Sequence, residues 1–244
     1  MKYLAAALTL SIPSCAHIDY NSVERGTFTG AAIVVWVGPG DKDVLGDGQF
    51  LYVPVTGNEL TFVRPDSSNP SGDSHIIRPE AFYTDGGSIP RSVQSVRGFN
   101  AWGYGPAYVI HDWLFVAKKC LNDAGTSGDL ITDEMRKISE MTFAESARVM
   151  SETIHSLVKE YDIGWGDEFS GPIITGVTAG PLTHKLWTET GKCNQLQVTD
   201  PEHLKIIADL QTRAPTLKTR TMPDMGYRVL REPEYLIVGA YRFE

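Results

Sequence analysis

Residues 107–121 (AYVIHDWLFVAKKCL) constrain the fold of this chain more than any other segment. Their apolar side chains occupy more than one face at helical spacing, which predicts a helix that is largely buried. His111 and Asp112 interrupt this helix, and a charged side chain in such a position is costly unless it is paired or hydrogen-bonded. Adjacent residues of a helix point about 100° apart, so at least one of the two faces protein. The fold must therefore surround this helix and supply polar partners for it.

The region before this helix is predicted to be β-rich, because apolar and β-branched runs of strand length alternate with Gly, Pro and Asn turn signals. The expected strands are residues 31–37, 50–55, 59–63, 75–77 and 80–83. The second and third of these flank the turn sequence Thr56-Gly57-Asn58, so we expect them to form a hairpin. The turn-rich segment 65–73 is expected to be a surface loop.

The region after it is predicted to be mainly helical. Thr132 is a good N-cap, with Asp133 and Glu134 in the first turn, and a single helix is expected from there to Lys159. Its packed face is made of apolar residues spaced mostly three to five apart: Met135, Ile138, Phe143, Ala147, Met150, Ile154 and Leu157. Residues 201–211 are expected as a short helix and 235–241 as a final strand, whereas 164–191 is ambiguous. The predicted fold class is α+β, with an N-terminal antiparallel β-rich part packed against two or three helices and an additional C-terminal region.

The N-terminus has the pattern of an export signal. Lys2 precedes the short apolar run 4–12 (LAAALTLSI), which is too short to span a bilayer but suits the apolar region of a signal peptide. The run ends at Ile12-Pro13-Ser14-Cys15, which resembles the lipobox of bacterial lipoproteins, with Pro13 in place of the usual small or hydroxyl residue. The resemblance implies lipidation of Cys15 as the new N-terminus, and Ala16 resembles the pattern that directs lipoproteins to an outer membrane. The alternatives are a plain secretory signal and a buried N-terminal helix.

The net charge and the cysteine content limit the binding partners and the covalent links that this chain can have. The net charge is −8 with a pI of about 5.3, and no run of Lys or Arg exceeds Lys118-Lys119. Such a chain is not expected to bind nucleic acid, which requires clustered cations. The expected partner is a membrane, through a lipid on Cys15, and no protein partner is specified. Export would permit a disulfide between Cys120 and Cys193, a question that two cysteines leave open. Neither cysteine has metal-ligand spacing around it.

Residues 84–91 (TDGGSIPR) form the first half of a candidate site. Two adjacent glycines release the backbone from its usual limits, so Asp85 and Ser88 can face one point. A carboxylate, a hydroxyl and the donor fork of Arg91 together suit a metal, an anion or another side chain. The alternative is a connector in which an Asp–Arg pair only fixes a turn.

His111 and Asp112 form the second half. We expect their partners to be Asp85, Ser88 and Arg91, which lie upstream in the loop. A buried histidine beside carboxylates has a shifted pKa and a fixed tautomer, which suits a metal ligand or a general base. The alternative is a core histidine that only bridges loop and helix. The histidines at 17, 155, 184 and 203 stand alone, and solvated or capping roles are the default for them.

Together the two halves resemble the bacterial and phage family known as domain of unknown function 1353. Its members share F-x-T-D-(G/L)-(A/G)-S-x-P followed by A-x-x-x-H-D-x-L. The matching residues are Phe82, Thr84, Asp85, Gly87, Ser88, Pro90, Ala107, His111, Asp112 and Leu114. The family also has an acidic residue in the first turn of a later helix, which Asp133 matches. The resemblance extends over roughly residues 27–160 and implies a fold unit and a site, but no reaction.

The resemblance gives a division of the chain. Residues 1–15 are expected to be a lipoprotein-like signal peptide, 16–26 a tether and 27–163 the domain that resembles the family. Residues 164–244 are expected to be a C-terminal extension packed on that domain.

Two functions follow. In the first, the protein is an envelope or phage-related lipoprotein of uncharacterised activity, whose polar cluster is mainly structural or binding. In the alternative, it is a metal-assisted hydrolase of envelope material such as peptidoglycan. The catalytic candidates are then Asp85, Ser88, Arg91, His111 and Asp112, and the metal ligands Asp85, His111, Asp112 and Asp133. No other cofactor is indicated.

Two other enzyme classes fit less well. The order of His75, His111-Asp112 and Asp133 imitates that of the HD phosphohydrolases, but their fold is all-helical and His75 lies in β-like sequence. A serine hydrolase with Ser88 as nucleophile lacks the G-x-S-x-G elbow.

Overall fold

Strand β1 (Thr27–Pro39) is the centre of the molecule. Its side chains alternate between two buried environments: Ala32 and Val34 belong to one core cluster, and Ile33 and Val35 to another. A strand that is buried on both faces needs an unbroken apolar run, which explains the sequence AAIVV. The computed structural model describes residues 16–39, 48–84, 104–124, 128–161, 170–193, 197–213, 220–221, 230–231 and 236–243.

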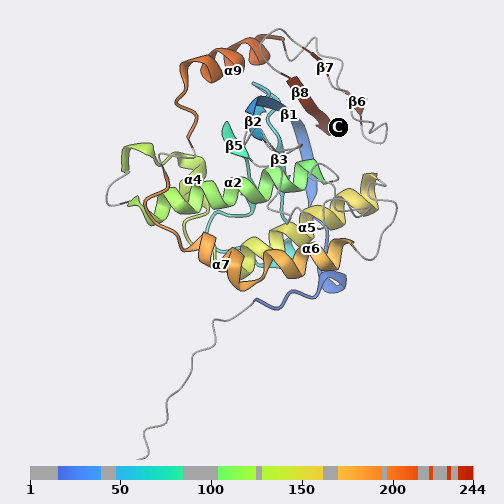
Figure 1. Cartoon of the computed structure of the whole chain (residues 1–244). Helices are drawn as coiled ribbons and strands as arrows, with labels where there is room; N and C mark the ends of the chain where they lie inside the picture. Colours follow the sequence, from blue (N-terminus) through green and yellow to red (C-terminus); the bar gives the residue numbers. More distant parts are fainter. Residues whose placement is uncertain are drawn as a thin grey trace, which may run out of the picture.

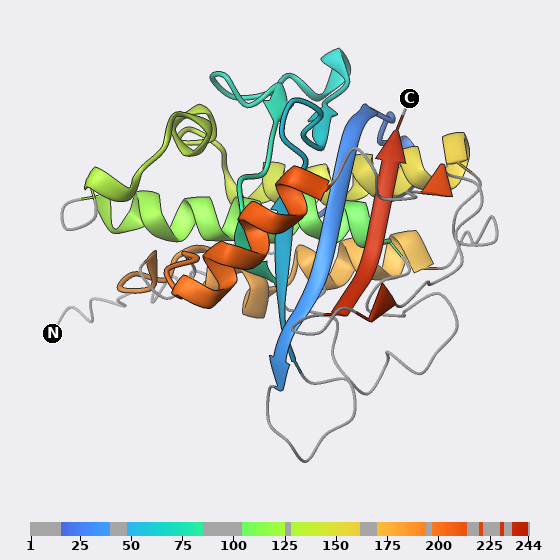
Figure 2. The ribbon, with the colours of Figure 1, turned by 90° about the horizontal axis from the view of Figure 1, so that it is seen from above.

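A mainly antiparallel sheet is built around β1 (Figure 2). Strand β2 (Gly48–Pro54) pairs with β1 from Pro39↔Gly48 to Ala32↔Pro54, and β8 (Leu236–Phe243) pairs with it from Trp36↔Leu236 to Gly30↔Phe243. The remaining strands are β3 (Thr61–Val63), β4 (Ile76–Ile77), β5 (Phe82–Thr84), β6 (Arg220–Thr221) and β7 (Leu230–Arg231). Among the strands that the structure describes, only β6 runs parallel to its neighbour, β8. The expected antiparallel β-rich part is confirmed.

The expected hairpin of residues 50–55 and 59–63 is wrong. Both segments form strands, but each pairs with β1, at Ala32↔Pro54 and at Thr29↔Thr61. The backbone between them hydrogen-bonds to β1, because the Ala31 N–H donates to the Asn58 carbonyl at 2.7 Å. A side chain at Gly30, whose φ is +83°, would overlap the backbone of this loop. The turn therefore shifts the chain along β1 instead of reversing it.

Helices cover both faces of the sheet (Figures 1 and 2). On one face lie α2 (Gly105–Asn122), α4 (Asp133–Lys137), α5 (Phe143–Tyr161), α6 (Ser170–Thr178) and α7 (Pro181–Trp187). Helix α9 (Pro201–Arg213) crosses the opposite face. Short 3-10 turns are η1 (Tyr20–Ser22), η2 (Asp66–Ser68) and η3 (Gly128–Leu130). The expected α+β class and the predicted helices at 107–121 and 201–211 are confirmed.

The single helix expected from Thr132 to Lys159 is wrong, because the chain forms α4 and α5 with a turn between them. Thr132 caps α4 as predicted, accepting from the Met135 N–H at 3.2 Å. A second cap starts α5: the Glu145 N–H donates to Thr142 Oγ1 at 3.2 Å, and the Thr142 N–H donates to Glu145 Oε2 at 2.9 Å. This reciprocal pair is a capping box, and it sets a new helix start inside the apolar pattern.

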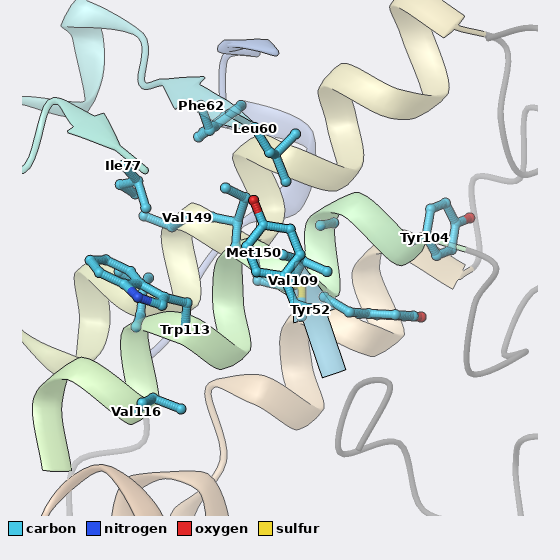
Figure 3. Packing of buried hydrophobic residues seen from close by; sticks show 14 of the residues in the cluster. Tyr52, Leu60, Phe62, Ile77, Tyr104, Val109, Trp113, Val116, Val149 and Met150 are labelled. Atoms are coloured by element: carbon cyan, nitrogen blue, oxygen red, sulfur yellow. The ribbon is translucent and has the colours of Figure 1, made fainter. Parts of the chain in front are cut away.

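Two apolar cores result from the two covered faces. The larger lies between the sheet and the helices of its first face, and Figure 3 shows Tyr52 of β2 packed among Val109 and Trp113 of α2 and Met150 of α5. The smaller lies under α9, whose Ile206 and Leu210 cover the far side of β1. Among the described residues no helix is both long and apolar enough to cross a membrane.

A disulfide links α2 to the segment after α7, which answers the question that the sequence left open. It joins Cys120 and Cys193, whose Cα atoms lie 4.4 Å apart. The carboxylate of Asp123 accepts from the backbone N–H groups of Gly191 and Lys192, at 2.6 and 2.9 Å, and from that of Cys193 at 3.2 Å. These bonds hold the pKa of Asp123 below its usual range, with the Gly191 bond contributing most. The segment is therefore fixed both covalently and by an ionised carboxylate.

Candidate functional site

The candidate site lies where strand β5 ends against helix α2. Strand β5 is the edge strand beside β2, paired through Phe50↔Thr84, and its last residue is the first of the TDGGSIPR motif. Helix α2 contacts this strand and holds the His111-Asp112 pair in its second turn. The sheet therefore delivers the start of one motif directly to the helix that contains the other.

A short hydrogen bond joins the two motifs. Thr84, which is buried, donates from Oγ1 to Oδ2 of the half-buried Asp112 at 2.6 Å. A hydroxyl bond to a carboxylate is stronger than one between neutral groups, and it offsets part of the cost of placing this charge on a packed helix. The sequence predicted that Asp112 needs a partner in the upstream motif, but it named Asp85, Ser88 and Arg91 and overlooked Thr84.

His111 is the most unusual side chain of the site. It is 5% exposed, and its ring packs 4.9 Å from that of Phe115, one turn further along α2. Its Nε2 has no hydrogen-bond partner among the residues that the structure describes. Burial lowers the pKa of His111 to about 4, so the ring is neutral at pH 7. A neutral imidazole can accept a proton or bind a metal ion through the ring nitrogen that carries no hydrogen.

The other candidates divide into two groups. Asp85, Ser88, Arg91 and the lipidation candidate Cys15 lie outside the described residues. Asp133 is described: its side chain is 95% exposed at the start of α4 and pairs with Arg136 at 2.7 Å. Within the described ranges, no three His, Cys, Asp or Glu side chains lie close enough together to hold a metal ion. Among the described candidates, the structure thus brings His111 and Asp112 together on α2 and directs Asp133 to solvent.

A second buried polar cluster was missed by sequence reasoning. Arg64, 1% exposed, donates to both carboxylate oxygens of Glu152 on α5, from Nε at 2.9 Å and from Nη2 at 3.2 Å. Glu152 also accepts from the Ser68 hydroxyl, and Glu145 lies 3.7 Å from the guanidinium. Burial would raise the pKa of Glu145, but bonds from Thr142 and Ser71 lower it overall. The available signal was a glutamate inside the apolar face of a helix.

The isolated histidines also have structural roles that their isolation did not predict. His203 of α9 lies with Nδ1 2.7 Å from the hydroxyl of Tyr83, which joins α9 to β5. His155 of α5 lies with Nδ1 2.7 Å from the carbonyl of Val23 and so holds the N-terminal segment. Neither is a solvated or capping side chain.

The family comparison agrees with the two motifs. The model of the family described as Protein of unknown function (DUF1353) matches residues 66–153. The suspected resemblance is confirmed over this segment. The DUF1353-like segment runs from η2 to α5 and contains β4, β5, α2 and α4, hence both motifs. It is shorter than the expected 27–160 and leaves out β1 and Arg64. Comparison with curated proteins and with solved structures gave no match.

Proposed function

We propose that this protein is an exported envelope lipoprotein, bacterial or phage-related, in which the DUF1353-like segment is a structural or binding module. It is held by a lipid on Cys15 in the outer membrane and faces the periplasm. The observation that carries the proposal is the Cys120–Cys193 disulfide. Disulfides persist in oxidising compartments such as the periplasm and are rare in the cytosol.

The environment of the Cys120–Cys193 disulfide is that of a stable structural disulfide. Both cysteines are buried, at 0% and 1% exposure, and the Asp123 carboxylate fixes the backbone up to Cys193. Reducing agents reach exposed and strained disulfides first, so a buried one suits long residence outside the cytosol.

The contacts at the motifs support a structural or binding role. The bond from Thr84 to Asp112 ties the edge strand to α2, and His111 is buried and neutral beside it. Residues that join an edge strand to a core helix fix the strand and the helix relative to each other. A binding module needs such positioning and no complete catalytic set.

The test of this proposal is the fate of Cys15. The full chain is expressed in a Gram-negative host beside Cys15→Ala, with membrane fractionation and mass analysis of the mature N-terminus. The expected result is an acylated Cys15 in the outer-membrane fraction, and release of Cys15→Ala from it. An N-terminus that retains Met1, or the same fractionation of both chains, would contradict the proposal.

A second candidate function is favoured by Nε2 of His111, which is buried and has no hydrogen-bond partner in the described part of the chain. In this alternative, a metal-assisted hydrolase of envelope material, Asp85, His111 and Asp112 hold a divalent ion or activate water. Arg91 binds an anionic group of the substrate and Ser88 supplies a hydroxyl. The neutral ring of His111 is the protonation state that a metal ligand requires.

Metal analysis of the mature chain separates the two candidates. The wild type is compared with His111→Ala and Asp85→Ala by metal content and thermal melting. Stoichiometric metal that both variants lose, with little change in melting temperature, supports the hydrolase. Absence of metal, with both variants strongly destabilised, contradicts a metal site and supports the structural role.

A further inference from the structure

An apolar surface lies on the outer side of α6 and the first turn of α7. Ile173 and Val177, one helical turn apart, are 49% and 45% exposed, and Leu182 is 72% exposed. The hydroxyl of Thr183 donates to the Val177 carbonyl at 3.0 Å and holds the start of α7 against the end of α6. We call Ile173, Val177 and Leu182 the α6–α7 apolar face. Of the five large apolar side chains exposed among the described residues, these three belong to two consecutive helices whose adjacent ends are hydrogen-bonded, which marks a candidate interaction surface.

Helix α6 is firmly seated through its other side. Ile174 is 3% exposed in the main core, and Thr175 shares a hydroxyl hydrogen bond of 2.9 Å with Ser151 of α5. The helix is therefore fixed to the domain without any contribution from Ile173 or Val177. Ile173 and Val177 are therefore exposed on a helix that is well packed against the domain.

The charge pattern of this region is unlike that of the rest of the chain. The chain contains 30 acidic residues, yet none occurs from Ser170 to Thr188. The sole Lys or Arg in that interval is Lys185, which is exposed on α7. Carboxylates resist transfer into a lipid interface, whereas a lysine can extend its ammonium to the headgroups. Helices with exposed apolar residues, no acidic residue of their own and one lysine suit a lipid interface.

The N-terminal segment approaches the domain at this same helix. Turn η1 lies against α6 (Figure 1). The ring of Tyr20 covers Gly171 so closely that a side chain there would overlap it. The ring of His155 packs against that of Tyr20 in a tilted arrangement, with the ring centroids 5.2 Å apart, and helps to fix this segment. Four residues lie between Cys15 and Tyr20, so five residue steps reach at most roughly 18 Å, and α6 itself is about 13 Å long. A lipid on Cys15 would thus bring a membrane surface within about one helix length of the apolar face.

We propose that the α6–α7 apolar face rests in the lipid interface of the membrane to which Cys15 is anchored. The anchor and the face together give the domain one orientation on the bilayer. This inference rests on the proposed lipidation of Cys15. Helix α9, on the opposite face of the sheet, points away from the membrane in this orientation (Figure 2).

Quenching by brominated lipid tests the contact directly. Leu182→Trp and the control Leu204→Trp each add a tryptophan to the lipidated full chain, at a face residue and at an exposed leucine of α9. In phosphatidylcholine vesicles we expect brominated acyl chains to quench the fluorescence added by Leu182→Trp and to leave that of Leu204→Trp unchanged. Adding Ile173→Asp and Val177→Asp to Leu182→Trp should abolish the quenching without lowering the melting temperature.

The outcomes distinguish this inference from the proposed function. If Cys15 is not acylated, a Cys15→Ala chain held by an N-terminal histidine tag on nickel-chelating lipid attaches the same end to the vesicle and repeats the measurement. Equal quenching of the two tryptophans, or none of either, overturns the inference in both preparations. A dimer in sedimentation that Ile173→Asp dissociates would assign the face to a second copy and would also overturn it.

Discussion

The two buried polar clusters of this protein differ in how completely their groups are satisfied. Around Arg64 and Glu152 both charges are paired in a bidentate arrangement, with serine hydroxyls completing the bonding. Around His111 and Asp112 the carboxylate is bonded to Thr84, whereas Nε2 of the histidine has no partner among the described residues. A saturated cluster can only hold elements together, but a cluster with a buried free nitrogen can still accept a ligand. The comparison therefore separates a structural site from a candidate functional one.

The largest expected effect is at the saturated cluster. Glu152→Ala removes the bidentate partner of the buried Arg64 guanidinium and leaves it only the longer pair with Glu145, at 3.7 Å. Breaking a buried ion pair in this way costs about 3–5 kcal/mol of unfolding free energy. Urea denaturation of the mature chain measures it. The double variant Arg64→Met with Glu152→Leu removes both charges and should recover most of the loss. Equal destabilisation in the single and double variants would mean that packing, and not charge, holds this cluster.

The second-largest expected effect is a pH dependence of the unfolding free energy that comes from His111. Its pKa is about 4 in the folded protein and ordinarily about 6.5, so the unfolded chain binds more protons between these values. The contribution is therefore fully present above about pH 6.5 and is lost as the pH falls toward 4. At one pKa unit per roughly 1.4 kcal/mol, the loss is on the order of 3 kcal/mol.

The variant His111→Gln isolates this term, because other carboxylates also titrate at acid pH. Urea unfolding of both chains at pH 7 and pH 4.5 gives, for each chain, the change in unfolding free energy between the two pH values. The wild type should lose more stability than the variant over this interval. Parallel profiles would show that His111 does not titrate in this range, and would remove the buried neutral ring from the comparison.

The smallest effect is at the bond between the two motifs. Thr84→Val keeps the shape of the side chain but removes the hydroxyl that donates to Asp112, which should cost about 1–2 kcal/mol. The matched control is Thr178→Val, whose hydroxyl donates only to the Thr175 carbonyl within its own helix. Thermal melting of the two variants should separate them, with the larger decrease for Thr84→Val. Similar melting temperatures would show that this bond does not stabilise the junction.

Local sequence patterns were enough to predict the helices and strands that are buried on more than one side, because burial requires a long apolar run. The apolar run of β1 and the apolar helix α2 were found because each is enclosed on more than one side. The break between α4 and α5 was also encoded, in the sequence Thr142-Phe-Ala-Glu145. It was overlooked because the apolar spacing continues through it.

Contacts between residues far apart in the sequence could not be predicted from these local patterns. The turn at Thr56-Gly57-Asn58 does not form a hairpin because Gly30, far earlier in the chain, allows the loop to lie against β1. Arg64 and Glu152 are 88 residues apart, and no local rule connects them. For the same reason Thr84 was missed as the partner of Asp112, although both residues belong to recognised motifs.

The pairing of β1 with β8 has a consequence for how this chain reaches its folded state. Ala32 lies opposite Tyr241, so the central strand acquires one of its two neighbours from a segment more than two hundred residues later. Contacts of such high contact order form slowly, because a long loop must close first. A ribosome-bound or partly translocated chain without β8 therefore cannot complete its sheet. If the protein is exported as proposed, an export channel that accepts only unfolded polypeptide would meet a substrate whose topology itself delays folding.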